Sequence, residues 1–402
     1  MFAEGARFPR PDAPCPLPRS KSIRAVRYTG RQCDYSQMAI ADTFLTSWAA
    51  DGHLYSAYAD GYVAGANGSK VGVTCGTEIT RTEVTHTGNA VIVGDDPFAL
   101  RIQPLAPAEQ RHTWYPACYP SGLLVRDGIW FYACHYRGWY LDRLDRRLCY
   151  EQGPNRFRIS SDLGKTWRWS PLDDRNPVIP ETGRCAGVWP IKMGTAHFVD
   201  FGKNMEYSPD GYAYIVGHGT SEFDGVSNWC AGDEMFLARV KPTPETINCK
   251  SAYEYFAGLR AGNRPIWSRN FSEIQPVIRW ACRCGLPAIT YFPALKKYVA
   301  IFCVGWPDGL GGQYDMWVAE SDALWGPWSL VTYWDAFADQ AYYAQVPSKF
   351  VKPDGRFVLF YSGHWIGPKL LPQEWSKKPA IPDLPNAKYT LCAAEFQLEL
   401  LK

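Results

Sequence analysis

The feature that most constrains the fold is a unit that recurs along the chain: an apolar strand, a tight turn and a second strand rich in aromatic residues. Four copies turn at an Asp-Gly pair, and they lie at residues 45–60, 121–135, 196–218 and 347–364. A fifth copy, at residues 287–305, turns at Lys296-Lys297 without the glycine. Asp-Gly between two alternating apolar runs is the strongest short-range signal of a β-hairpin. The sequence therefore predicts five hairpins of one kind.

Each hairpin is followed by a second, weaker pair of strands, in the runs 71–84, 157–170, 235–242, 316–332 and 391–400. Two hairpins per unit, repeated with almost no helical periodicity, are typical of β-propeller blades and disfavour a β-sandwich or a β-helix. We predict an all-β, single-domain propeller over residues 23–402, after a Pro-rich N-terminal extension over residues 1–22. Five blades can be counted. The stretches 89–117 and 249–283, and a strand near residues 23–28, could supply one or two more.

One repeat carries a named turn motif. Residues 160–167 read Ser-Ser-Asp-Leu-Gly-Lys-Thr-Trp and fit the Asp-box, Ser-x-Asp-x-Gly-x-Thr-Trp, of sialidase-like propellers. In this motif the serine and aspartate side chains bind backbone amides of the turn, while the tryptophan packs between blades. The motif therefore indicates the fold and supplies no chemistry. Residues 321–328 form a degenerate turn of the same kind.

Charge and cysteine content constrain the partners and the compartment. The 42 basic and 40 acidic residues leave a net charge of +2, which argues against binding to nucleic acid or a membrane surface. No apolar run approaches the length of a membrane span. Thirteen scattered cysteines and two glycosylation sequons, at Asn67 and Asn270, favour a secreted, extracellular glycoprotein with disulfides. We expect this protein to be a monomer.

Polar residues recur where the second strand of a hairpin leaves its sheet. His135 and His218 lie seven residues after their turn glycines, Asp60 lies eight after, and His364 nine after. Equivalent strand ends of all blades open on the same face, so we expect these side chains to gather on one rim. A single histidine at a strand end is usually a surface or hydrogen-bonded residue, whereas three at equivalent exits favour a functional site.

Other candidate residues surround this rim. The first strands of propeller blades line the central channel, so Tyr119 and His197 are predicted to point toward it. An arginine on the rim could bind an anion, although a solvated surface charge is the ordinary role of such a residue. A tryptophan there is either a platform for a sugar ring or a wedge between blades. The candidates for substrate binding are His112, Tyr115, Arg137, Arg184, Trp229 and His364.

The chemistry is narrowed by what the sequence lacks. It contains no nucleophile elbow, phosphate-binding loop, HExxH zinc motif or Rossmann glycine pattern. A glycosidase needs two facing carboxylates, and few acidic residues lie near the predicted rim, Asp60, Asp224 and Asp308 among them. Histidine, tyrosine and arginine suit β-elimination at a uronic acid. There a cation or donor neutralises the C5 carboxylate, a base removes the α-proton and an acid protonates the departing O4.

Five segments share an overall pattern with known proteins: 192–204, 212–222, 252–259, 285–300 and 338–365. They resemble a group of propeller enzymes that includes ulvan lyases and the rhamnosyl-glucuronate lyase that trims gum arabic, together with a related rhamnosidase-type family. The resemblance spans most of the chain from about residue 40. It implies seven blades, and cleavage on the O4 side of a glucuronate that carries a rhamnose-type neighbour.

The resemblance also implies roles for the candidates. Histidine and tyrosine would be base and acid, and an arginine or histidine would face the substrate carboxylate. The catalytic residues are then His135 as the first choice, followed by His197, His218 and Tyr119, with Arg184 or Arg137 as the carboxylate partner. The elimination requires no cofactor. A structural calcium or zinc ion is left open, because the scattered cysteines give no clear ligand set.

Three functions follow from these observations. The favoured one is a polysaccharide lyase that cleaves a rhamnose–glucuronate linkage in a glucuronate-containing polysaccharide or oligosaccharide. The alternative is a glycoside hydrolase that releases a terminal sugar such as rhamnose, with a histidine or a carboxylate pair activating water. The third is a non-catalytic propeller that binds glycans.

Overall fold

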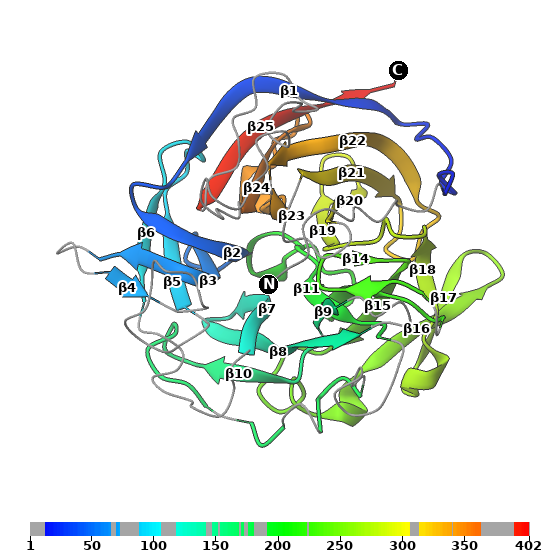
Figure 1. Ribbon diagram of the computed structural model, residues 1–402, viewed down its shortest axis with the longest axis horizontal. Coiled ribbons are helices and arrows are strands. Elements are labelled where there is room, and N and C mark those ends of the chain that lie inside the picture. Colours follow the sequence, from blue (N-terminus) through cyan, green and yellow to red (C-terminus); the bar gives the residue numbers. More distant parts are fainter. Residues whose placement is uncertain are drawn as a thin grey trace.

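The five predicted hairpins are all present, and each provides the two inner strands of one sheet. The five sheets stand around a central axis in the computed structural model (Figure 1). The structure describes residues 13–65, 70–72, 88–105, 118–141, 147–151, 153–168, 170–172, 176–180, 191–222, 225–305, 313–339, 341–362 and 390–401. No helix among these residues has the length and apolar character needed to cross a membrane.

In chain order, the hairpins define blades one to five. They are β2 (Ala39–Trp48) with β3 (Leu54–Ala64), β7 (Cys118–Arg126) with β8 (Ile129–Leu141), β11 (Gly194–Phe198) with β12 (Ala213–Gly219), β19 (Ala288–Phe292) with β20 (Lys297–Val304), and β23 (Tyr342–Gln345) with β24 (Arg356–Ser362). The first strand of each hairpin contacts the first strands of both neighbouring blades, so the ring closes with five members.

The turns explain why one hairpin forms without glycine. The four turn glycines have φ between +72° and +88°, in the left-handed region where glycine is unstrained. In the fifth copy Lys296 takes this conformation, with φ +52°. The surrounding strand pairing therefore imposes the turn on a residue that does not favour it.

The outer strands show why the seven blades implied by the resemblance are wrong. Stretches that could have formed extra blades instead widen existing sheets. Blade one gains β4 (Lys70–Gly72), β5 (Gly88–Val93) and β6 (Arg101–Pro104), and its third strand is β5. Of the predicted run 71–84, residues 71–72 belong to β4 and residues 73–84 lie outside the described residues. Blade two gains β9 (Arg147–Glu151) and β10 (Arg156–Ser160), and blade four gains β21 (Gln313–Ser321) and β22 (Ser329–Asp339).

Blade three is the widest sheet. It holds β15 (Glu234–Val240), β16 (Glu254–Arg260), β17 (Arg264–Ser268) and β18 (Pro276–Arg279), the last three from the stretch 249–283. A separate ribbon, β13 (Ser227–Asn228) with β14 (Ala231–Gly232), lies between β12 and β15 in the chain. The described helices are short 3-10 turns: η2 (Lys203–Met205), η3 (Lys250–Ala252), η4 (Phe271–Glu273) and η5 (Ser348–Phe350).

Blade five joins the two ends of the chain. Its third strand is β25 (Leu391–Leu400), and its outermost strand is β1 (Ile23–Asp34), which pairs with β25 along almost its full length. The strand predicted near residues 23–28 is therefore the closing strand of the ring and not part of an additional blade. Figure 1 shows β1 in blue lying along β25 in red.

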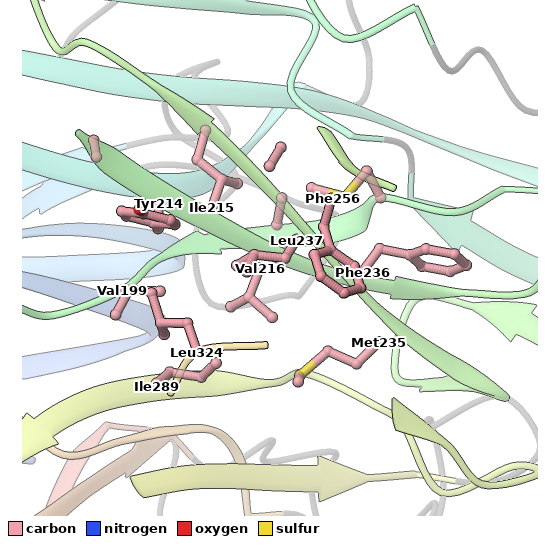
Figure 2. Close-up of a cluster of buried hydrophobic side chains, with 14 of the residues drawn as sticks. Val199, Tyr214, Ile215, Val216, Met235, Phe236, Leu237, Phe256, Ile289 and Leu324 are labelled. Carbon is pink, nitrogen blue, oxygen red and sulfur yellow. The ribbon is translucent and has the colours of Figure 1, made fainter. Parts of the chain in front are cut away.

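The core lies between the blades, where the faces of neighbouring sheets meet. Between blades three and four, Val216 and Leu237 pack with Ile289 and with side chains of the turn after β21 (Figure 2). Alternating apolar residues on each strand supply both faces of a sheet, because every blade packs on two neighbours. This two-sided burial accounts for the near-continuous apolar runs of the inner strands.

The Asp-box has the predicted geometry. The Ser160 hydroxyl accepts a hydrogen bond from the Gly164 N–H at 2.8 Å, and the Asp162 carboxylate accepts from the Thr166 N–H at 2.9 Å and its hydroxyl at 2.6 Å. Trp167 lies edge-on to Trp130 of β8, in a cluster shared with blade one. The bonds from Thr166 hold the pKa of Asp162 down to about 2.

The disulfides expected from the cysteine content are not found. No disulfide joins any two of the nine cysteines whose side chains the structure describes. The buried Cys303 thiol donates to the Ala341 carbonyl at 2.9 Å, and burial raises its pKa. Here cysteine serves as a small apolar core residue, a common use of the buried thiol.

We predict that ring closure depends on Phe396 of β25. Its ring is fully buried and packs on Tyr28 of β1 and Phe357 of β24, with centroids 5.7 and 5.8 Å away. Phe396→Ala should lower the free energy of unfolding by about 3–5 kcal/mol, measured by denaturant titration. Glu399→Ala on the same strand removes only surface ion pairs, with Arg24 and Arg27, and should cost less than about 1 kcal/mol. Equal losses in the two variants would contradict this prediction.

A second prediction concerns the Asp-box at acid pH. Because the pKa of Asp162 is lowered in the folded state, its stabilising effect is present above the unfolded-state pKa near 3.8 and is lost as the pH falls toward about 2. Asp162→Ala should therefore be less stable than the wild type near neutral pH, and the gap should close in acid. Ser161→Ala, at an exposed position of the same motif, should show no gap at either pH.

Candidate functional site

Four blades bend their inner strands at one common level of the channel. Non-glycine residues with positive φ lie there: Thr43 at +57°, Thr195 at +45°, Leu286 at +42° and Tyr343 at +49°. In blade two the pairing of β7 with β8 skips at the corresponding place, between Pro120 and Leu123. Such conformations cost about 1–3 kcal/mol each and cluster at functional sites. We call this end of the channel, where the inner strands begin, the entry end.

A buried carboxylate is held at the entry end. Asp42 of β2 is 3% exposed. The Tyr342 hydroxyl donates to its Oδ2, and the Thr43 hydroxyl donates to its Oδ1 at 2.7 Å. Tyr342 belongs to β23, so this bond joins the first blade to the last. Two donors fix the orientation of the carboxylate.

Aromatic rings pack around the donor of this bond. The Tyr342 ring lies 5.6 Å from the rings of Trp229 and Tyr314 and 5.3 Å from that of Tyr343. Trp229, at the tip of the β13–β14 ribbon, is 5% exposed. Of its two predicted roles, this placement matches the wedge between blades and not an exposed platform for a sugar.

The three predicted catalytic histidines are all buried. His197 of β11 stacks on Tyr343, with ring centroids 5.9 Å apart. His218, at the end of β12, donates from Nε2 to the Asn228 carbonyl at 2.8 Å. His135, at the end of β8, stacks on its cross-strand partner Tyr119 at 6.3 Å. The strand ends therefore place them near the entry end as expected, but beneath its surface rather than on an open rim.

The other predicted residues cannot be compared with the structure in the same way. His112, Tyr115, Arg184 and His364 lie outside the described residues, as do Asp224 and Asp308. Arg137 lies on β8 and Asp60 on β3, but their side chains are not described. Their predicted roles in substrate binding and catalysis stay predictions.

Sequence reasoning missed Asp42 and its ring of tyrosines. The available signal was a carboxylate inside the apolar strand 39–48, because a buried charge is costly unless it is bonded. The pattern of strand ends drew attention to Asp60 instead. Asp60 follows Ala59, which is the register partner of Asp42 across β2 and β3, so the two aspartates lie on adjacent strands.

Below the entry end, the channel holds a cavity of about 30 Å³, with room for about one water molecule. His197 and Asp200 are among the side chains that line it. The Asp200 carboxylate accepts from the N–H and hydroxyl of Ser348, at 2.8 and 2.6 Å, and from the Gly202 N–H at 2.9 Å. Burial raises the pKa of Asp200 despite these bonds. Among the described residues no three acidic, histidine or cysteine side chains form a metal cluster, so calcium or zinc stays a prediction.

Comparison with protein-family models and with curated proteins gives no match. Several solved structures are similar. A glycoside hydrolase family 43 protein from Bacillus licheniformis is 11% identical with a TM-score of 0.43, over 82% of this chain and 50% of that one. A family 117 glycoside hydrolase from Zobellia galactanivorans is 10% identical with a TM-score of 0.46, over 93% and 90% of the two chains. An α-L-arabinofuranosidase from Podospora anserina is 8% identical with a TM-score of 0.41, over 94% and 96%.

These comparisons correct the predicted reaction. The three similar enzymes are glycoside hydrolases, and the prediction of a polysaccharide lyase is therefore wrong. The chain spans half the length of the Bacillus protein. The identities of 8–11% and TM-scores of 0.41–0.46 limit the likeness to general architecture, which the strand pairings of this chain establish independently.

We predict that Asp200 gives the fold a distinct pH dependence. A carboxyl whose pKa is raised by folding stabilises below the unfolded-state pKa, near 3.8, and loses that effect as the pH rises through the folded-state value. Asp200→Asn should abolish this slope in the free energy of unfolding. It should also cost about 1–3 kcal/mol, because an amide NH₂ would oppose a donor of Ser348. Parallel pH profiles for the wild type and the variant would contradict the assignment, and exposed Asp322→Asn is the control.

Proposed function

We propose that this protein is a glycoside hydrolase that removes a terminal sugar, such as rhamnose, from a polysaccharide or oligosaccharide at the entry end of the channel. The observation that carries the proposal is the buried carboxylate of Asp42, which accepts hydrogen bonds from Thr43 and Tyr342 at the strained end of an inner strand. Hydrolysis of a glycosidic bond needs such a group, either to activate water or to attack the sugar.

Asp42 is suited to this role by its surroundings. The Thr43 and Tyr342 hydroxyls each hold one of its two oxygens. Tyr342 is fixed by the rings that pack on it, so its hydroxyl cannot turn away from Asp42. A carboxylate held by locked neighbours is preorganised for reaction and loses little energy to reorientation. The buried rings are thus positioning residues rather than sugar platforms.

Hydrolysis needs a second carboxyl group to protonate the departing oxygen. The sequence offers Asp60, Asp224 and Asp308 near the predicted rim. Asp60 is the first choice, because its backbone lies on the strand next to Asp42.

We predict that Asp42→Asn will lower kcat by about 10²–10⁴-fold. The substrates are 4-nitrophenyl glycosides of α-L-rhamnose, β-D-xylose and α-L-arabinofuranose, and release of nitrophenol is followed by absorbance. Asp354→Asn, at an exposed hairpin turn of blade five, is the matched control and should keep full activity. Tyr342→Phe provides a milder variant.

The same assay tests the second carboxyl group. Asp60, Asp224 and Asp308 are each replaced by Asn, and kcat should fall most for the residue that acts as the acid. The fall should be smallest on substrates with activated leaving groups, because these need little protonation. If the wild type hydrolyses none of these glycosides yet binds oligosaccharides, the protein is a glycan-binding propeller and the proposal is wrong. If Asp42→Asn retains full activity, the carboxylate has been assigned wrongly.

A further inference from the structure

A second cleft lies at the seam where blade five meets blade one. It is near the hairpin turns, at the end of the blades opposite the entry end. It has a volume of about 270 Å³ and is bounded by β1, β24, β25 and the turn between β5 and β6. Figure 1 shows β1, β25 and β24 beside the strands of blade one. The charged residues of this seam cleft are Arg31, Asp95, Asp96, Lys352, Arg356 and Glu395. The volume is near the lower end of ordinary ligand pockets, about 300–1,000 Å³, which suits a small ligand.

A bulge in β1 delivers one wall of the cleft. The pairing of β1 with β25 skips between Tyr28 and Gln32, and Gly30 inside the bulge has φ +89°. Arg31 is thereby turned so that its guanidinium lies 4.3 Å from the Phe98 ring centre and 3.3 Å from a carboxylate oxygen of Glu395. Bulges on edge strands commonly re-aim a side chain in this way.

The cleft is held open by contacts on its far wall. The nearly buried ammonium of Lys349 lies 3.0 Å from Asp95 and donates to the Gly52 carbonyl at 2.7 Å, which fixes the β5–β6 turn against the first hairpin. The Tyr35 hydroxyl donates to the Pro97 carbonyl of the same turn at 2.7 Å. Preformed walls reduce the entropy lost on binding.

The charges of the cleft are balanced. Three cations, Arg31, Lys352 and Arg356, line the cleft together with three carboxylates, so one opening offers both donors and acceptors with no net formal charge. An anion would meet the carboxylates and a cation would meet the guanidinium groups, and both would be disfavoured. A hydroxyl group both donates and accepts, so a neutral molecule rich in hydroxyls matches this arrangement.

We propose that the seam cleft is a second saccharide-binding site, which takes a neutral sugar unit and lies apart from the entry end. It lies near the hairpin turns of the blades, whereas Asp42 lies near the opposite end, where the inner strands begin. Binding here requires no turnover, so this inference goes beyond the proposed hydrolase activity and does not depend on Asp42.

The test is isothermal titration of the full chain with cellotriose, xylotriose, arabinotriose and L-rhamnose, each with the wild type and Asp42→Asn. We expect at least one of these to bind both proteins equally. Arg31→Ala and Lys352→Ala should each weaken that binding about 10-fold, the loss expected for one hydrogen bond to a charged group. Arg24→Ala is the matched control, because Arg24 also lies on β1 and pairs with a glutamate of β25, but outside the cleft.

Each other outcome overturns the inference. Binding that survives Arg31→Ala and Lys352→Ala would place the sugar elsewhere, and binding lost only in an entry-end variant would assign it to that end. If none of the four sugars binds, a saccharide is ruled out as the ligand of the cleft. Citrate and spermine are titrated as charged probes, and tight binding of either would replace the neutral ligand with an ion. Absence of hydrolysis by the wild type, with sugar binding at the cleft retained, would count against the proposed function alone.

Discussion

The pairing of β1 with β25 is the constraint on which the rest of this structure depends. Propeller blades bury both faces on their neighbours, so an unclosed ring would expose the faces of its first and last sheets. Here the last blade takes its third strand from the C-terminal part of the chain and its outermost strand from the N-terminal part. The interblade cores, the bent inner strands and the seam cleft all depend on that closure. The bulge in β1 also places Arg31 in the wall of the seam cleft.

Local signals predicted the hairpins because a tight turn between apolar runs is encoded within a few residues. The Asp-box was predictable for the same reason: its bonds join Ser160, Asp162, Gly164 and Thr166, which are close in sequence. The number of blades could not be predicted from local signals. Whether the stretch 249–283 forms a new blade or widens blade three depends on pairing with β15, which no short segment specifies. The resemblance to seven-bladed lyases could not replace that information.

The candidate site shows the same division. Strand exits placed His135 and His218 near the entry end, because equivalent ends of blades open on one face. Their burial could not be read from that pattern, since it depends on partners such as Asn228 that come from separate segments. Asp42 was missed because the hydrogen bond that marks it as a candidate comes from Tyr342, three hundred positions away in the sequence. A carboxylate becomes a candidate catalytic group only when the fold supplies the donors that fix it.

The bond between Asp42 and Tyr342 has a consequence for the order of events during synthesis. Its two partners lie in the first and last blades, and Tyr342 is held in a sheet whose third strand ends at Leu400. As the chain emerges from a ribosome, blades one to four can begin to pack, but the carboxylate lacks its Tyr342 donor until β25 is released. A nascent chain would thus carry most of the fold and an incomplete site. Activity would appear only when the ring is complete.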